Sequence, residues 1–524
     1  MIQAIRKIIG RLIGPDRRLA AINEQLQTRL RATYDAARTT DEFKNYWANA
    51  DRLDADSANS KEVRHKLISR SRYEAANNAF SDGIAQTITN DLIGNGPALR
   101  MQTQSQGFNQ MVELTWDLWG QAIGLNRKLW CMGHAKHVDG EGFAVIRKNP
   151  GVRHPIPMDL QLYEAEQVQT AYLPMEPGYI DGIKFDQFGN PIWYDVMQQH
   201  PGTTNGALAY SPIPEQVPAD RMLHWFRLRR PGQHRGIPEM ASALNSGAAA
   251  RRWREATLSA AERAALLTLI MKTPMPPGEA DQFAPFSTMD LEKGMMSFLP
   301  EGWEPFQAEG KFPTANHEQF NNSLINEMGR SVNMPRNKAA ADSSGYNYAS
   351  GRLDHGTYFD ALNIQRMDCA ALVLNPLFAI WFDLAVVRFG WLGGDPTAIS
   401  PFARLHLWDW PKHRVADVEA EANANETKLT SGQIGLHRLY SDAGMDFEDE
   451  VEAMAVTFGI TSDEMRTRLL DVLYPAVVAP ADPNANVMPA SQQKAMDQAV
   501  AAALRQLENR REGLKVNGNG VGHG

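Results

Sequence analysis

The sequence predicts a mainly helical α+β protein that is divided into several regions. The chain has 524 residues, more than one ordinary hydrophobic core can organise. Most long segments place apolar residues at steps of three and four, which is the spacing of one helix face. Between residues 142 and 228 the pattern changes to short runs that are typical of strands. Together these observations indicate helices packed around a smaller β region.

The first 132 residues are predicted to be mainly helical, with a polar loop at 51–60. Residues 1–15 form a short basic amphipathic segment, which would either lie on a membrane surface or, in the interpretation we prefer, pack against a partner or its own domain. A helix is expected over 16–38, and a second runs from about Tyr73 to the stop signal Gly94-Asn95-Gly96-Pro97. A third is expected over 109–132.

Strand-like runs follow in the middle of the chain. They cover residues 142–147, 160–168, 179–185, 192–197 and 222–228. The third and fourth runs flank Asp186-Gln187-Phe188-Gly189-Asn190-Pro191, which predicts a hairpin with a turn longer than two residues.

The second half of the chain returns to helical periodicity. A long helix is predicted over 238–271, where Pro274 and the prolines after it end the pattern. Residues 274–315 are punctuated by Pro and Gly and predict a small β-rich module. Further helices are expected over 317–332, over 353–374 with a break at Pro376, and between 417 and 473.

Two stretches of this half lack a regular pattern. Residues 336–351 are small and polar, which predicts a flexible loop. Beyond Ala479 the chain is rich in Pro, Asn, Gln and Gly, which predicts a disordered tail interrupted at most by a helix at 492–509.

Charge and cysteine content narrow the class of protein. The net charge is −8. The protein therefore either does not interact with DNA or lets DNA slide past without binding its phosphates tightly. Two cysteines, Cys131 and Cys369, exclude a disulfide scaffold and fit a reducing cytosol. The most apolar stretch, 372–392, contains Asp383 and Arg388, so we expect a buried helix and no membrane partner.

No catalytic residue, metal site or cofactor is predicted. Gly310-Lys311 is followed by Phe312 and lacks the upstream glycine of a phosphate-binding loop. Cys131, His134 and His137 would point to different faces of a helix, so one metal ion could not easily reach all three. The serines near Gly345 and Gly351 lack the strand-to-helix setting of a nucleophile. We therefore expect a protein that is not an enzyme.

Several short motifs occur in a fixed order between about residue 60 and residue 475. They are Arg70-Ser71-Arg72, Gly94-Asn95-Gly96, Asp139-Gly140-Glu141-Gly142-Phe143, Val217-Pro218-Ala219 with His224, Arg230-Pro231-Gly232-Gln233-His234-Arg235-Gly236-Ile237-Pro238, Tyr346-Asn347-Tyr348-Ala349-Ser350-Gly351-Arg352 and Ala443-Gly444-Met445-Asp446. In this order the chain resembles the lambda-type family of bacteriophage portal proteins. The chain has Ser350-Gly351 where that family often has two serines before the arginine, a change that would loosen the loop.

The resemblance implies a ring, usually of twelve subunits, at one vertex of the viral capsid. Such a ring is the channel for genome packaging, retention and ejection, and it docks the packaging motor and the tail. The implied partners are other copies of the chain, the terminase large subunit, the major capsid protein and scaffold, a head–tail connector protein, and double-stranded DNA bound without sequence preference. The implied location is the virion, after assembly in the host cytoplasm.

The family plan also implies a division of the chain into an arm, a wing, a stem, a clip and a crown. The boundaries are 1–60 for an N-terminal helical arm, 61–237 for the wing, 238–273 for the first stem helix, 274–315 for the clip, 316–335 for the second stem helix, 336–352 for a tunnel loop, 353–412 for the wing's return helix, 413–478 for the crown and 479–524 for a flexible C-terminal tail.

Two sets of site residues follow from this plan. The polar and cationic residues expected to face DNA from the tunnel loop are Arg336, Asn337, Lys338, Asn347, Tyr348 and Arg352. The apolar residues expected to contact a neighbouring subunit or the terminase from the clip are Met295, Met296, Phe298 and Leu299, because so short a segment cannot bury them itself.

Two other classes of protein compete with this interpretation. A different virion protein, such as a head–tail adaptor or a minor capsid protein, would also lack catalytic motifs but would lack the order of stem, clip and stem. A nuclease or terminase would need clustered carboxylates for metal ions or a phosphate-binding loop, and the sequence contains neither pattern.

Overall fold

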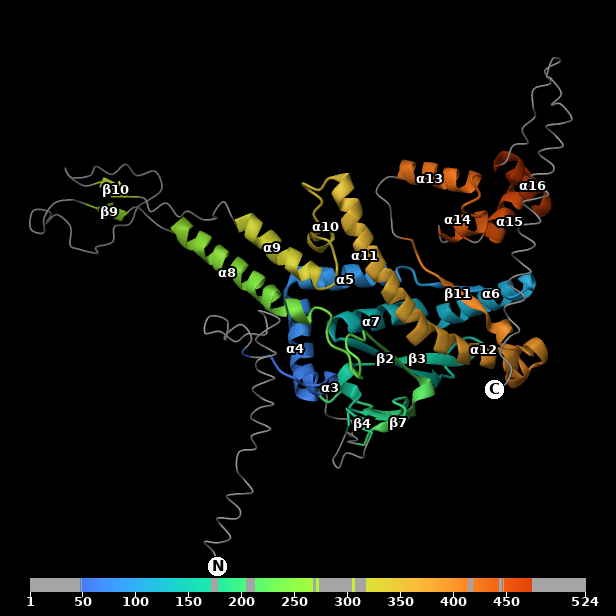
Figure 1. Ribbon diagram of the computed structural model, residues 1–524, viewed down its shortest axis with the longest axis horizontal. Helices are drawn as coiled ribbons and strands as arrows, with labels where there is room; N and C mark the ends of the chain where they lie inside the picture. The colour runs from blue at the N-terminus through green and yellow to red at the C-terminus, as the bar shows by residue number, and fades with distance from the viewer. Residues whose placement is uncertain are drawn as a thin grey trace, which may run out of the picture. The chain divides into compact units, whose positions relative to one another are not determined.

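The computed structural model describes most of the chain between residues 48 and 473. The described residues are 48, 50–170, 178–203, 213–266, 270–272, 304–306, 317–412, 418–442, 445 and 447–473. They belong to two compact units, which divide between His413 and Arg414 (Figure 1). The predicted helix at 16–38, the C-terminal tail and all four predicted clip residues lie outside the described part. The α+β class is confirmed, with helices in both units and short antiparallel sheets in the first.

The first unit begins with three helices, α3 (Ala55–Ala58), α4 (Lys61–Asn77) and α5 (Ala79–Ile93). The prediction of one helix up to Gly94 was wrong, because Asn78 adopts an extended conformation between α4 and α5. Its side-chain oxygen accepts a hydrogen bond from the amide of Phe80 at 3.2 Å and so caps α5. Its side-chain amide donates to the carbonyl of Gly247 at 3.1 Å, a distant contact that the local sequence does not reveal.

The predicted helix at 109–132 is also two helices, α6 (Gln106–Ile123) and α7 (Leu125–Val138). Gly124 between them has a left-handed backbone with φ of 66°. A glycine adopts this conformation without the Cβ clash that other residues meet, so it ends α6 and allows α7 to start in a new direction.

Strands are present in all five predicted segments, but the run at 160–168 ends at Tyr163 before a 3-10 turn, and the run at 179–185 forms two short strands. One sheet has the order β3 (Met158–Tyr163), β2 (Glu141–Lys148) and β8 (Met222–Phe226), with antiparallel neighbours. A second contains β4 (Tyr179–Ile180), β5 (Ile183–Phe185), β6 (Pro191–Val196) and β7 (Glu215–Pro218). The predicted hairpin joins β5 to β6, and the Asp186 carboxylate accepts the amides of Phe188 and Asn190, each at 2.8 Å.

A third, two-stranded sheet pairs β1 (Ala98–Met101) with β11 (His406–Asp409). Short 3-10 turns connect the larger elements. They are η2 (Ala165–Gln167), η3 (Ala219–Arg221), η4 (Ala241–Ala243), η6 (Trp391–Gly393), η7 (Pro396–Ala398) and η8 (Pro401–Arg404).

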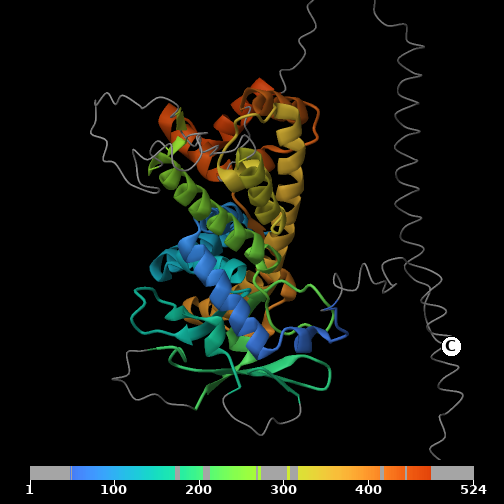
Figure 2. The same ribbon diagram turned by 90° about the vertical axis from the view of Figure 1, so that its left-hand side faces the viewer.

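Two neighbouring helices, α8 (Leu244–Leu266) and α9 (His317–Arg330), lie side by side in Figures 1 and 2. The Trp253 indole donates a hydrogen bond to His317 at 3.1 Å, and its ring meets that of Phe320 at 5.0 Å between centroids. The predicted helix at 238–271 was too long at both ends. Residues 241–243 form a 3-10 turn, and β9 (Ile270–Lys272) pairs with β10 (Glu304–Phe306) in an antiparallel ladder.

Segment 336–389 is more helical than predicted. It contains α10 (Arg336–Ala340), α11 (Tyr348–Cys369), a π-helical turn at Ala370–Leu374 and α12 (Asn375–Phe389). The predicted loop therefore contains α10 and the start of α11, and only 341–347 connect them. The predicted break at Pro376 is absent. The wider π turn that precedes Pro376 accommodates its ring, which would otherwise clash with the carbonyl of residue 372.

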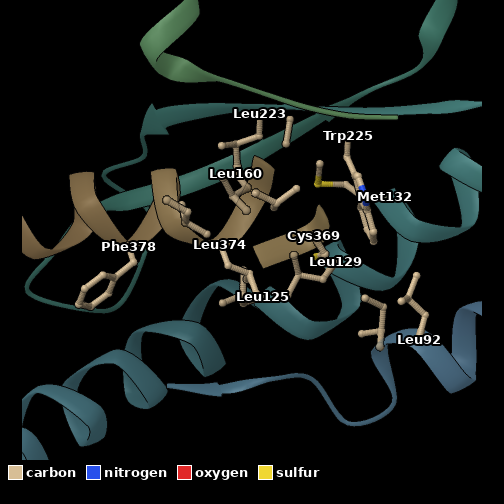
Figure 3. Packing of buried hydrophobic residues seen from close by; sticks show 14 of the residues in the cluster. Leu92, Leu125, Leu129, Met132, Leu160, Leu223, Trp225, Cys369, Leu374 and Phe378 are labelled. Carbon is tan, nitrogen blue, oxygen red and sulfur yellow. The ribbon is translucent and has the colours of Figure 1, made fainter. Parts of the chain in front are cut away.

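The large core of the first unit forms where this long helix meets the sheet and α7. Figure 3 shows Leu160 and Trp225 from the sheet, Met132 from α7, and Cys369 and Leu374 from the long helix converging on one another. All of them are buried. Each large apolar side chain removed from water contributes roughly 1.5–3 kcal/mol to folding.

The stretch Ala349–Phe389 is long and apolar enough, by length and composition alone, to cross a membrane. One face of it is buried in the core of the first unit through Tyr358, Leu362, Leu377 and Trp381. That burial accounts for the apolar residues of this face, while Ile364, Met367 and Val387 of the same stretch are exposed.

The second unit contains α13 (Val418–Thr430), α14 (Leu436–Asp442), α15 (Phe447–Phe458) and α16 (Ser462–Leu473). The helices predicted between 417 and 473 are thus present. Phe447, Val451 and Ala455 of α15 pack with Met465 of α16 in a small core of their own.

Candidate functional site

Three of the sequence motifs meet at one buried carboxylate, that of Glu141 at the start of β2. Arg235 donates to it through Nη2 at 2.6 Å and Nε at 3.1 Å. The amide of Gly236 donates to Oε2 at 2.8 Å, and the Nε2 of His224 lies 3.1 Å from the same oxygen. Glu141 is 1% exposed, so these contacts replace water completely. The motifs around 139–143, 224 and 230–238 are therefore parts of one structure.

A fourth motif joins through the neighbouring carboxylate of Asp139. Arg72 on α4 binds both of its oxygens, at 2.7 and 2.9 Å. A second arginine of α4, Arg64, forms an ion pair with Asp181, and its Nε lies 3.8 Å from Glu141. Paired arginine and carboxylate groups of this kind have a fixed geometry, so α4 is held in register against the sheet.

Glycines allow the backbone segments at this junction to touch. A Cβ built on Gly140, where φ is 95°, would lie 2.3 Å from the carbonyl carbon of Ile237. A Cβ on Gly236 would lie 2.2 Å from the carbonyl oxygen of Gly140. No side chain fits at either position, because both distances are far below van der Waals contact.

Glu141 and Arg64 remain ionised at neutral pH, whereas His224 is favoured in its neutral form. Burial alone would raise the pKa of Glu141, but Arg235 and His224 outweigh it and hold that pKa well below its usual range. Burial and the nearby Arg235 lower the pKa of Arg64 to about 9, so Arg64 stays charged at neutral pH. Burial also lowers the pKa of His224, which favours the neutral imidazole.

A second buried cluster follows directly along the chain at Glu239. The Nζ of Lys136 lies 2.6 Å from Glu239 and 2.8 Å from the side-chain oxygen of Gln365, while His137 contacts the other Glu239 oxygen at 3.0 Å. Lys136 is fully buried. This cluster ties α7, the segment that leads into α8, and α11 to one another.

The sequence analysis missed Lys136 and Glu239, although a signal was present. Lys136 continues the buried face that Leu125, Leu129 and Met132 define on α7. A cation on such a face must be paired, because burying it alone is costly. The carboxylates of both clusters are paired with buried cations, so the clusters fix the arrangement of the elements that carry them.

Two of the predicted DNA-facing residues, Asn337 and Lys338, make side-chain contacts with other helices. Lys338 on α10 forms an ion pair with Asp91 on α5, and Tyr358 donates a hydrogen bond to the same Asp91 oxygen at 2.9 Å. Asn337 hydrogen-bonds the His355 ring at 3.0 Å. The α10 helix is thus fastened to both α5 and α11.

The remaining predicted residues lie around the short connection 341–347. The Asn347 side chain accepts the Ser350 amide at 2.9 Å and caps α11, and Tyr348 is the first residue of that helix. The Arg336 guanidinium lies 5.8 Å from the centre of the Tyr346 ring, and Arg352 is exposed on the first turns of α11.

The exposed part of this connection carries no cation. Its sequence is Ala341-Asp342-Ser343-Ser344-Gly345-Tyr346-Asn347, in which Asp342 is the only charged residue. Residues 341–345 are exposed. Asn337 and Lys338 contact His355 and Asp91 within the subunit, and that these two residues also face DNA stays a prediction.

One group among the described residues has donor atoms close enough to hold a metal ion. The ligand atoms of Glu164, Glu166 and His200 lie within 4.8 Å of one another. Arg72 pairs with both carboxylates, at 3.0 Å each, and also with Asp139, so its single positive charge offsets only part of the negative charge of this group. Cys131, His134 and His137, which the sequence analysis did not predict to bind a metal, do not share one site. His137 contacts Glu239, whereas the His134 ring stacks on Trp130 at 5.1 Å.

The chain is similar to one family of known sequences and to several solved structures. A family model described as phage portal protein, lambda family, matches residues 8–365. None of the curated proteins compared with the chain matches it. A chain of the native gene transfer agent virion is 12% identical with a TM-score of 0.39, over 72% of this chain and 93% of that one.

Two further solved structures are similar. A chain in the neck of the native gene transfer agent particle, solved with C12 symmetry, is 14% identical with a TM-score of 0.40, over 72% of this chain and 93% of that one. An HK97 family phage portal protein from Corynebacterium diphtheriae is 12% identical with a TM-score of 0.25, over 57% of this chain and 85% of that one.

Proposed function

The chain belongs to the lambda family of phage portal proteins, and from that premise we propose that its copies form a ring, of twelve subunits, around the path of viral DNA at one capsid vertex. The observation that carries the proposal is the family match over 8–365, which includes α10, the connection 341–347 and most of α11. In this role the protein conducts DNA during packaging and ejection and retains it in between, without catalysing a reaction.

We assign the regions of the chain to this ring as follows. The wing comprises 61–237 and 353–412, the stem comprises α8 and α9, the clip lies at 274–315 and the crown at 413–478. The arrangement of α8 beside α9 supports a two-helix stem. The hydrogen bond from Trp253 to His317 joins the two helices, and the pairing of β9 with β10 continues from them toward the clip. The buried clusters at Glu141 and Glu239 would hold α8 at a fixed angle to the wing.

The connection 341–347 is the segment that we place against DNA. Its ends are fastened by the Lys338–Asp91 ion pair and by the Asn347 cap, so the tip can bend while its base stays fixed. Serine hydroxyls and backbone amides make brief hydrogen bonds to phosphate without reading sequence. A tip with one negative charge and no cation avoids the counterion release that makes DNA binding tight.

The proposed partners follow from the same role. We propose contacts with the terminase large subunit and with a head–tail connector at the clip, with the capsid protein and scaffold at the wing, and with DNA in the channel. The protein would be assembled in the host cytoplasm and reside in the virion. Replacing Phe298 with Asp should leave folded subunits that fail to close into rings, if Met295, Met296, Phe298 and Leu299 contact a neighbour.

Native mass spectrometry and negative-stain imaging of the purified full-length protein test the ring directly. Twelve-subunit rings with a central hole are the expected result, and a compact monomer would contradict the proposal in favour of an adaptor or minor capsid protein. The channel-facing position is tested separately by placing a photocrosslinker on S344C. Crosslinks to DNA threaded through the ring are expected, and a matched label on S69C of α4 should give none.

The contribution of the tip to DNA retention is tested by removing residues 342–345 from the portal in an assembling phage. This deletion keeps α10 and the Asn347 cap, so we expect rings to assemble. DNA packaged per particle, or DNA retained after filling, should fall. Normal values of both would show that the tip does not act on DNA.

A further inference from the structure

We propose that Asp91 is a positioning residue that keeps Lys338 from gripping DNA, so that the channel lets phosphates pass. The inference rests on the proposed function, because it concerns the same loop. It assigns a role to a residue on α5 that lies outside the loop and carries the opposite charge. Asp91 thereby sets how strongly the loop can bind a polyanion.

The first observation is the way in which Lys338 is held. Its ammonium group pairs with the Asp91 carboxylate and lies over two aromatic rings, 5.0 Å from the centre of Tyr358 and 5.4 Å from that of Phe359. The ion pair therefore holds Lys338, one of the two cations of α10 together with Arg336, against the body of the subunit.

The second observation is that Asp91 itself is fixed. It receives the Tyr358 hydroxyl at 2.9 Å, and the backbone carbonyls of Asp91 and Leu92 accept Arg366 at 2.9 and 3.2 Å. Tyr358 is completely buried, so its hydroxyl has little freedom to leave Asp91. The carboxylate is thus presented to Lys338 in one orientation by α5 and α11 together.

The third observation is that the pair is accessible enough to open. The side chains of Lys338 and Asp91 are 23% and 26% exposed. Ion pairs of this exposure contribute only about 0–1 kcal/mol, because water screens them. A lysine on a flexible stem would then be able to turn to a DNA phosphate if the carboxylate were lost.

The fourth observation is the net charge of α10 and the exposed tip. The tip contributes only Asp342, whose pKa is lowered by hydrogen bonds from Ser344 and, to a smaller extent, by Arg336, which lies beside Tyr346. With Asp91 in place, the α10 and tip region therefore presents little net positive charge to DNA. Without it, every subunit would present one additional cation at the same level of the ring.

The experiment measures binding of a 30-base-pair duplex to rings of the full-length protein over a series of NaCl concentrations. Asp91→Asn removes the charge but keeps an oxygen that can accept the Tyr358 hydroxyl. We expect D91N rings to bind DNA several-fold more tightly, with a log–log salt slope that steepens by about 0.9 for each additional phosphate engaged. D91N/K338M rings, which keep the net charge of the native pair, should bind like the unaltered protein, and K338M rings should bind no more tightly.

Asp82→Asn is the matched control, since Asp82 lies on the same helix and bonds Gln86 at 2.8 Å. It changes the net charge as much as D91N does, and its DNA affinity should stay unchanged. Tight binding that persists in D91N/K338M, or appears in D82N, would show a general charge effect and overturn the inference.

The D91N/K338M variant keeps the inference testable even if D91N rings fail to form. Because its net charge equals that of the native pair, weaker DNA binding by D91N/K338M would mean that Lys338 already contacts DNA, which contradicts the proposed role of Asp91. The S344C crosslink separates the two proposals. Crosslinking with no effect of D91N overturns the role of Asp91 alone, whereas absence of crosslinking overturns the position of the loop.

Discussion

Gly140 and Gly236, which are far apart in the sequence, touch through their backbones: a Cβ on Gly236 would lie 2.2 Å from the carbonyl oxygen of Gly140. The contact brings the Gly236 amide to the Glu141 carboxylate at 2.8 Å and Arg235 to the same group. Two glycines therefore give the motifs at 139–143 and 230–238 a common backbone contact. The ion network depends on that contact, because a side chain at either position would push the arginine away.

Replacing Gly236 with Ala should destabilise the first unit. The added methyl group meets backbone atoms, which cannot rotate away, so we expect the free energy of unfolding to fall by about 1–3 kcal/mol or more. Urea unfolding followed by tryptophan fluorescence measures the change. Gly356→Ala on α11 is the control, since nothing lies within 4 Å of its Cβ position, and helix propensity there favours Ala by roughly 0.5–1 kcal/mol. Equal stability of the two variants would contradict the packing described for Gly236.

Replacing Glu141 with Gln should lower the free energy of unfolding more than the substitution of any exposed residue does. The substitution leaves the buried Arg235 without its main carboxylate partner, with only Asp181 remaining at 3.5 Å, and breaking a buried pair costs roughly 3–5 kcal/mol. Glu62→Gln on the exposed face of α4 should stay within about 0.5 kcal/mol of the unaltered protein. A loss below about 1 kcal/mol for E141Q, measured by thermal or urea unfolding, would mean that the network is not held together by this charge.

Stability should decrease as the pH falls from 7 to 5, in part because of His224. Burial lowers its folded pKa below the ordinary value of 6.5, so the unfolded chain takes up the proton first. Between the two pKa values the unfolded state holds more protons, and lower pH therefore favours unfolding. The variant H224Q keeps a side-chain nitrogen for Glu141 but does not titrate, so its melting temperature should depend less on pH in this range. H437Q, which removes an exposed histidine, should follow the original slope.

The start of α11 should depend on Asn347. Its side chain accepts the Ser350 amide at 2.9 Å, and loss of such a cap costs about 1 kcal/mol. In N347A we expect faster amide hydrogen exchange in the first turn of α11, while N347D, which keeps the acceptor, should exchange like the original. Unchanged exchange in N347A would show that the helix start is held by other contacts.

The local pattern of the sequence was sufficient for the class of most elements. Steps of three and four predicted α5, α6 and the helices of the second unit, and the Asp186 to Pro191 segment predicted the hairpin, because turn chemistry and one buried face act over a few residues. The ordered motifs were sufficient for the family, and the match over 8–365 confirms it. The assignments of the clip and of the DNA-facing residues stay predictions.

Only the tertiary structure decided where elements break and which charges are free. Asn78 ends α4 because its amide reaches Gly247, and the helix passes Pro376 because a π turn precedes it. Lys338 was expected to face DNA, yet its partner Asp91 lies 247 residues earlier in the chain. A pattern read along the sequence records the chemistry of each side chain but not its distant neighbour. For a charged group that neighbour determines whether the charge is neutralised within the protein or offered to a ligand.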